Sequence, residues 1–178
     1  MSAMVDVGPN ADRSPQPGTG VEVGLFKEAM TRFPSGVTIV TTRDEEGRPH
    51  GFTASAFSSV SADPPMILTC LDKTARCHDA FLAAQRFSLA FLRPEHWDLA
   101  RRFASKVEDK FDATFTTDPY GLARLPDALA YLVCEMEQQV PAGDHTILIG
   151  RVISVTLGEG DPAVFYSRNL RHLRDLQR

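Results

Sequence analysis

A chain of 178 residues, of which 43% are hydrophobic and 24% are charged, is long enough for one domain with a sizeable core. The net charge of −4 offers no basic surface for nucleic acid or an anionic membrane, and no apolar run is long enough to span a bilayer. The three cysteines are odd in number and lack a Cys-x-x-Cys spacing. This usage argues against a disulfide framework or a zinc site and favours a reducing cytoplasm.

The first 20 residues contain prolines and acidic side chains but no apolar stretch, so they are not a secretory signal. We expect residues 1–20 to form a disordered tail and residues 21–178 to form a single domain. A short amphipathic helix is predicted over Leu25–Phe33, because apolar residues recur there at helical spacing, and Pro34 ends it.

The rest of the chain alternates strand-like runs with turns. Strands are predicted at Val37–Thr42, at a return strand through Pro49 and His50, and at Met66–Leu71, Phe87–Leu92, Ala130–Gln138, His145–Leu157 and Ala163–Tyr166. Helices are predicted over Cys77–Ala84 and from Pro94 to about Ala104, with a mostly irregular segment over 112–126 and a charged tail over 167–178.

Two strands carry more specific expectations. Alternation in Ala130–Gln138 predicts a strand that is buried on one face only, and Gly150 marks a bend or bulge in His145–Leu157. Because the strands are mostly linked by hairpin-type turns, the fold class predicted is mainly β with peripheral helices, arranged as an antiparallel β-barrel.

The stretch Gly51–Pro65 has an unusual composition for a core strand. It is rich in glycine, alanine, serine and threonine, whereas a strand that only packs carries branched and aromatic side chains. Small residues let a ligand approach the backbone, and hydroxyl groups add donors and acceptors with little bulk. The stretch is either a shelf for a flat polar ligand or an ordinary edge strand, and composition alone favours the edge strand.

Two further places allow a binding or a structural interpretation. The loop Asp72–Arg76 brings Lys73, Thr74 and Arg76 to the start of a helix, which suits a phosphate but equally fits a helix cap with solvated cations. His145 follows a glycine-containing turn, where it either contacts a ligand in a cleft or caps the strand.

The usual catalytic and nucleotide motifs are missing from the sequence. It has no Gly-x-Ser-x-Gly, no Gly-x-Gly-x-x-Gly, no phosphate-binding P-loop and no histidine spacing typical of a metal site. The sequence therefore predicts no catalytic side chain and no metal.

Several separated blocks, in order, are similar to the short-chain flavin reductases of two-component flavin-dependent monooxygenases. These blocks are Phe26–Val37, His50–Phe57, Ser59–Pro65, Arg102–Ala104, Asp109–Phe111 and Ala142–Thr146. The resemblance covers about Leu25 to Tyr166 and is strongest to actinomycete reductases that serve antibiotic-pathway hydroxylases. It implies the flavin-binding split-barrel fold, a homodimer and hand-off of reduced flavin to a monooxygenase.

The resemblance also assigns roles to residues. It implies that the flavin, FAD or FMN, is held by Thr53, Ala54, Ser55, Ala56, Ser59, Lys73, Thr74, Ala75, Phe103, Ala104 and Lys110. It places the nicotinamide nucleotide, NADH rather than NADPH, against His145, Tyr166 and Arg168. In such proteins Leu170 is commonly replaced by a second aromatic residue, which leaves the stacking partner of the nucleotide open.

Hydride transfer between two cofactors requires no protein acid or nucleophile, which agrees with the missing catalytic motifs. Two alternatives share the barrel: a protein that retains FMN and passes electrons to a partner, and a binding module for a nucleotide or haem without enzymatic activity. Retention of flavin through a desalting column distinguishes the first alternative, and absence of NADH oxidation distinguishes the second.

Overall fold

The computed structural model describes residues 20–173. Its strands are β1 (Ser35–Gly36), β2 (Thr38–Arg43), β3 (Pro49–Ala54), β4 (Phe57–Ala62), β5 (Pro65–Asp72), β6 (Arg86–Phe91), β7 (Thr116–Thr117), β8 (Ala123–Arg124), β9 (Ala130–Ala142), β10 (His145–Leu157), β11 (Ala163–Tyr166) and β12 (Asn169–His172). Its helices are α1 (Val23–Thr31), α2 (His78–Ala83), the 3₁₀ turn η1 (Pro94–His96) and α3 (Trp97–Ala104).

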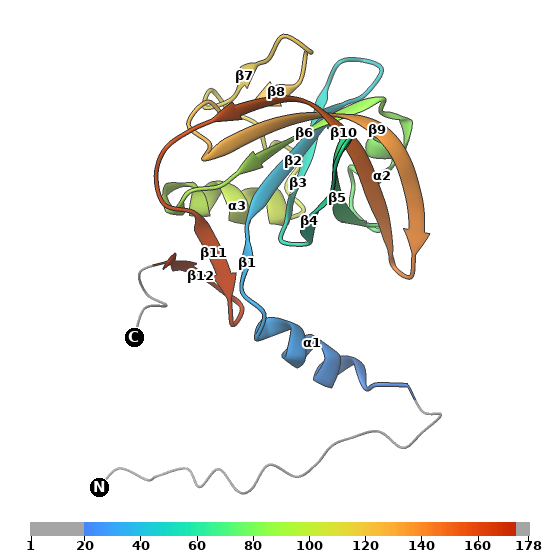
Figure 1. Cartoon of the computed structure of the whole chain (residues 1–178), viewed down its shortest axis with the longest axis vertical. Helices are drawn as coiled ribbons and strands as arrows, with labels where there is room; N and C mark the ends of the chain where they lie inside the picture. The colour runs from blue at the N-terminus through green and yellow to red at the C-terminus, as the bar shows by residue number, and fades with distance from the viewer. Residues whose placement is uncertain (1–19, 174–178) are drawn as a thin grey trace, which may run out of the picture.

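One antiparallel seven-stranded sheet forms the body of the molecule, in the order β3-β2-β6-β9-β10-β5-β4 (Figure 1). The two edge strands, β3 and β4, are consecutive in the chain and are joined only by Ser55 and Ala56. Smaller sheets, β1-β11-β12 and β7-β8, flank this body. The mainly β, antiparallel fold class is confirmed, and the barrel is split where β3 leads into β4.

The central strands are buried on both faces. One core cluster packs against α2 and includes Val40, Leu89 and Leu132, whereas a second packs against α3 and includes Ile39, Ala90 and Val133. Neighbouring residues of β2, β6 and β9 therefore face opposite cores, as alternation along a strand requires. The prediction that Ala130–Gln138 is buried on one face was wrong for its first half, because α3 and the segment after it cover the second face.

The limits of two strands, and a bulge in one of them, agree with the sequence-based predictions. β10 and β11 have the predicted limits, and Gly150 lies at a register shift between β9 and β10, which confirms the predicted bulge. A Cβ on Gly150 would lie 2.5 Å from the ring of Phe87, so the core requires glycine here. The predicted charged tail contains a strand, β12, that pairs with β11.

Helix α1 projects from the body beside β1 and the β11–β12 hairpin (Figure 1). Glu22 caps its start by accepting hydrogen bonds from the backbone N–H groups of Gly24 and Leu25. No residue of α1 is buried. Phe26 and Met30 on the helix are 53% and 54% exposed, and Phe33, just after its end, is 74% exposed. The predicted helix is confirmed, but its apolar face finds no partner within the described part of the chain.

The predicted disordered tail, residues 1–20, lies outside the described residues apart from Gly20. That residues 21–178 form a single domain stays a prediction. Among residues 20–173, no helix is long and apolar enough to cross a membrane.

Candidate functional site

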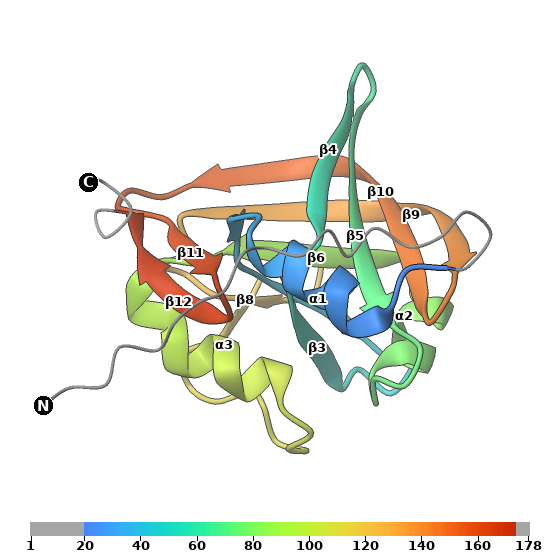
Figure 2. The same ribbon diagram turned by 90° about the horizontal axis from the view of Figure 1, so that it is seen from below.

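The corner between β3 and β4 is the centre of the candidate site. Ser55 and Ala56 are exposed there, and the hairpin of β4 and β5 extends away from the body beyond them (Figure 2). An edge strand carries backbone groups without a ladder partner on one side, so a ligand can bond to them. The Ala56 carbonyl already accepts the N–H of Cys70, which fixes the corner against β5.

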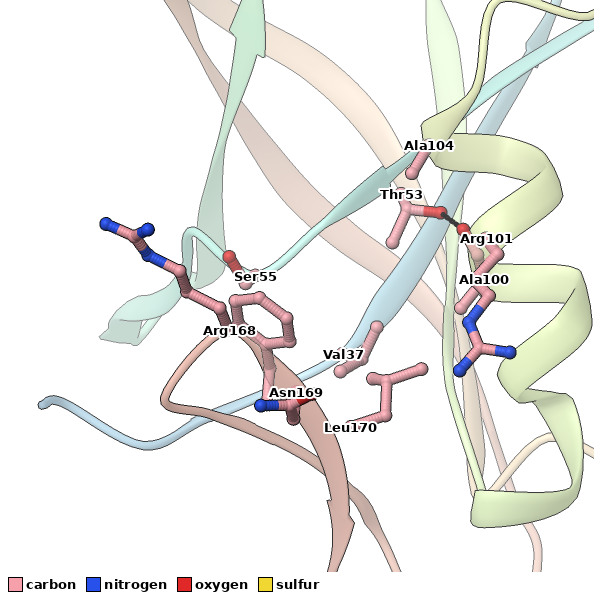
Figure 3. Close-up of a pocket in the computed structure, with 10 residues that line it drawn as sticks. Val37, Thr53, Ser55, Ala100, Arg101, Ala104, Arg168, Asn169 and Leu170 are labelled. Carbon is pink, nitrogen blue, oxygen red and sulfur yellow. Dashed lines mark hydrogen bonds between the residues drawn. The ribbon is translucent and has the colours of Figure 1, made fainter. Parts of the chain in front are cut away.

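A first cavity of about 350 Å³ lies between this corner, α3 and the β11–β12 hairpin (Figure 3). Its wall is mainly small and apolar, with Arg101 on one side and Arg168 on the other. The lining residues are Val37, Thr53, Ser55, Ala100, Arg101, Ala104, Phe165, Arg168, Asn169 and Leu170.

A second cavity of about 260 Å³ adjoins the first, because Thr53 and Ala104 line both. This second cavity is basic: Arg76, Lys106 and Lys110 line it, and the acidic side chain of Asp72 faces them. The two cavities together form a cleft with an apolar end and a cationic end. Such a lining fits a flavin, which joins an apolar ring system to an anionic phosphate chain.

Thr53 and Gly51 connect the shelf to α3. The Thr53 hydroxyl donates a 2.6 Å hydrogen bond to the Ala100 carbonyl, as the dashed line in Figure 3 marks. A Cβ on Gly51 would lie 2.7 Å from the Phe103 ring and 2.9 Å from the Val40 carbonyl oxygen. Gly51 therefore makes room for α3 without lining the cleft, whereas Thr53 both anchors α3 and lines both cavities.

Lys110 holds the chain after α3 in place. Its ammonium donates to the carbonyls of Phe103 and Gly51, at 2.8 and 3.3 Å. Burial lowers the pKa of this lysine. Because two of its three N–H groups are committed to backbone oxygens, Lys110 retains one for a ligand in the second cavity.

The loop after β5 is organised by Asp72. Both the N–H and the hydroxyl of Thr74 donate to the Asp72 carboxylate, at 2.7 and 2.8 Å, and these bonds lower the pKa of Asp72. The Lys73 ammonium donates to the Gly143 carbonyl at 2.7 Å, away from the second cavity. The donors of Thr74 and Lys73 thus stabilise the loop and the neighbouring β9–β10 turn.

His145 lines the second cavity at the start of β10. Its Nδ1 lies 2.8 Å from a carboxylate oxygen of Asp144, and the imidazole lowers the pKa of that aspartate. The side chain remains 42% exposed, so its other ring nitrogen is accessible to a ligand.

The turn of the β11–β12 hairpin has an unusual backbone. Ser167 and Arg168 have φ angles of 50° and 62°, the conformation of a type I′ turn that normally selects Asn-Gly. Hydrogen bonds from the Ser167 N–H to the Thr31 carbonyl, and from the Asn169 side chain to the Ser167 carbonyl, stabilise it. The turn holds Arg168 at the outer rim of the first cavity, with its guanidinium pointing away from Arg101 (Figure 3).

The structure brings most residues of the predicted site together, but in two groups. Thr53, Ser55, Ala104 and Arg168 line the first cavity, and the second contains Thr53, Thr74, Ala75, Phe103, Ala104, Lys110 and His145. Neither cavity is lined by Ala54, which faces the core, or by Ala56, Ser59, Lys73 and Tyr166. His145 and Arg168, both expected at the nicotinamide nucleotide, line different cavities.

Some lining residues were not among those predicted. Arg101, Lys106, Asn169 and Leu170 complete the cleft, and Arg76 joins them from the loop where the sequence had already indicated a cation. Arg101 and Arg102 are adjacent in α3, and the sequence gave no signal for which of the two faces the cleft. Within residues 20–173, no group of three or more histidine, cysteine or acidic residues could hold a metal ion.

A family model described as flavin reductase like domain matches residues 30–174. The chain is 45% identical over 152 residues to actinorhodin polyketide dimerase from Streptomyces coelicolor, covering 84% of this chain and 86% of that protein. It is 36% identical over 148 residues to the reductase component of 4-nitrophenol 4-monooxygenase/4-nitrocatechol 2-monooxygenase from Rhodococcus opacus, covering 83% and 79%. Two longer relatives from Rhizobium meliloti are 40% and 41% identical, and the chain spans 56% and 41% of their lengths.

The fold of this chain is also similar to that of a solved structure. The NADH:FAD oxidoreductase SgcE6 of Streptomyces globisporus, in complex with NAD and FAD fragments, superposes with a TM-score of 0.77 at 32% identity. The alignment covers 82% of this chain and 89% of that one. The chain therefore belongs to the family of proteins with a flavin reductase-like domain.

Proposed function

We propose that this protein is an NADH-dependent flavin reductase that reduces FAD or FMN and releases the reduced flavin to a partner monooxygenase. The observation that carries the proposal is the continuous cleft around Thr53 and Ala104, apolar at one end and cationic at the other, in a chain of this family. Similarity to a protein named for polyketide dimerisation supports a role in antibiotic or other secondary metabolism. The proposed compartment is the reducing cytoplasm, which the odd cysteine count supports.

The chain's own residues would bind and orient the two cofactors. When bound, the cofactors supply the chemistry, a hydride transfer from the nicotinamide to the flavin. The corner at Ser55 and Ala56 would hold the flavin ring, and the basic second cavity would bind its phosphate. For the nicotinamide nucleotide we propose His145, Tyr166 and Arg168, of which His145 and Arg168 line the cleft from its two ends.

The test is oxidation of NADH by the purified full chain, followed by absorbance, with and without added FAD or FMN. We expect turnover that saturates with free flavin, and a lower rate with NADPH than with NADH. Absence of NADH oxidation with either flavin would contradict the proposed function and favour a binding module without enzymatic activity. Turnover by a tightly retained flavin that survives desalting, with no effect of added flavin, would instead favour an electron-transfer protein.

His145→Ala is expected to raise the KM for NADH about fivefold and to leave the KM for flavin unchanged. The loss of one hydrogen bond corresponds to about 1 kcal/mol, and the effect on one substrate only separates binding from folding. Steady-state kinetics with each substrate varied in turn measure both constants. His145→Asn, which keeps a donor, should show a smaller rise; an unchanged KM for NADH in the alanine variant would exclude this role.

The exposed apolar side of α1 supports the proposed homodimer. Phe26, Met30 and Phe33 line a wide groove of about 730 Å³ that reaches the corner at Ser55 and Ala56. Large apolar side chains exposed together mark an interaction surface, and the groove continues into the flavin cleft. We propose that a second copy of the chain covers this groove, so that each flavin site lies beside the dimer interface.

Phe33→Asp is expected to convert the dimer to monomers at micromolar concentration. Burial of a phenylalanine is worth about 1.5–3 kcal/mol, and a buried unpaired carboxylate adds a further penalty, so the dimer dissociation constant should rise at least about 100-fold. Sedimentation velocity over a concentration series measures this. Leu157→Asp is the matched control: Leu157 is 78% exposed but does not line the groove. A dimeric Phe33→Asp variant would contradict the assigned surface.

A further inference from the structure

The segment between α3 and Phe111 is closed by contacts between its beginning and its end. The Phe103 ring packs on Phe111, with ring centroids 5.0 Å apart, and the Lys110 ammonium donates to the Phe103 and Gly51 carbonyls. The residues between them, Ser105 and Lys106, line the cavity. The segment therefore forms one wall of the basic end of the cleft, held in place independently of any ligand.

Arg76 stands on the opposite wall, in the loop between β5 and α2. Its Nη1 lies 3.3 Å from a carboxylate oxygen of Glu108, so an ion pair joins this cavity-lining arginine to the segment after α3, although Glu108 itself does not line the cavity. The side chains are 59% and 90% exposed. An exposed ion pair contributes little to stability, so an anion entering the cavity can replace the carboxylate at small cost.

A carboxylate and a phosphate compete for the same edge of a guanidinium group, because both present paired oxygens to its N–H groups. Glu108 also repels an incoming phosphate dianion, whereas Lys106 on the same segment attracts it. The donors of Thr74 and Lys73 are already committed within the protein, which leaves Arg76, Lys106 and the remaining N–H of Lys110 to meet an anion at this end.

We propose that Glu108 is an internal competitor for the flavin phosphate: it occupies Arg76 in the free protein and weakens phosphate binding, so that flavin leaves readily. This inference rests on the proposed function, since it concerns the affinity of the same cleft for flavin. A reductase that releases its product requires modest affinity, and an exposed carboxylate paired with Arg76 lowers the affinity for phosphate without changing the ring site.

The experiment compares FMN with riboflavin, which has the same ring but no phosphate, in the full-length protein. Glu108→Gln is expected to lower the Kd for FMN about threefold and to slow FMN dissociation by a similar factor, with riboflavin unchanged. Arg76→Gln should raise the Kd for FMN about fivefold, again without effect on riboflavin. In the double variant the Glu108→Gln gain should vanish, because the group for which the two anions compete is gone.

Glu95→Gln is the matched control. It removes the same charge from a glutamate whose partner, Arg93, lines neither cavity, and should leave both flavin affinities unchanged. The proposal is overturned if Glu108→Gln leaves FMN affinity unchanged, shifts riboflavin equally, or still tightens FMN binding in the Arg76→Gln background. Failure of the wild-type protein to reduce any flavin would overturn the proposed function instead, so the two failures are distinguishable.

Discussion

Ser55→Leu is expected to lower the affinity for FMN about 100-fold and to leave the stability of the fold nearly unchanged. Ser55 is exposed at the corner between β3 and β4, and it lines both the first cavity and the groove beside α1. A leucine there fills the space where a ring would lie against the strand backbone. Overpacking of this kind costs up to about 3 kcal/mol, which corresponds to about two orders of magnitude in affinity.

Fluorescence titration of FMN measures the loss, and thermal unfolding establishes that the fold persists. Ser55→Ala keeps the space open and should bind FMN within about threefold of the wild type, since only one hydroxyl is removed. Ser58→Leu is the matched control, because Ser58 is exposed on β4 and lines neither cavity. Undiminished FMN binding by Ser55→Leu would place the flavin elsewhere.

Phe103→Ala is expected to lower the free energy of unfolding by about 3–5 kcal/mol. The ring is 1% exposed and packs on Phe111 and Phe115, at centroid distances of 5.0 and 5.5 Å, while its edge fills the space that Gly51 leaves open. Removing it opens a cavity between α3 and the sheet. Because domains are stable by only about 5–15 kcal/mol, this change removes a large part of the total.

Urea unfolding followed by circular dichroism measures the change through the transition midpoint. Phe103→Leu keeps an apolar side chain in the cluster and is expected to cost about half as much. Because Phe103 also lines the second cavity, the alanine variant should bind FMN more weakly at temperatures where it remains folded. A loss below about 1 kcal/mol would contradict a central role for this ring.

Local sequence patterns determined most of the strands. Runs of β-branched and aromatic residues next to glycine and proline turns predicted His145–Leu157 and Ala163–Tyr166 with their observed limits, because both signals act within a few residues. The bulge at Gly150 followed from the same local argument. The separated sequence blocks further indicated the family, and all of them except Ser59–Pro65 include a residue that lines the cleft.

Only the tertiary structure decided which partner each polar side chain takes. Lysine is a residue type that commonly binds phosphate, but Lys110 and Lys73 donate hydrogen bonds to backbone carbonyls from distant parts of the chain. The burial of both faces of β9 likewise depends on a core cluster to which α3 and the segment after it contribute from elsewhere in the sequence. Spacing along a chain reports the period of an element, whereas the face that α3 covers and the atoms that meet a lysine are set by long-range packing.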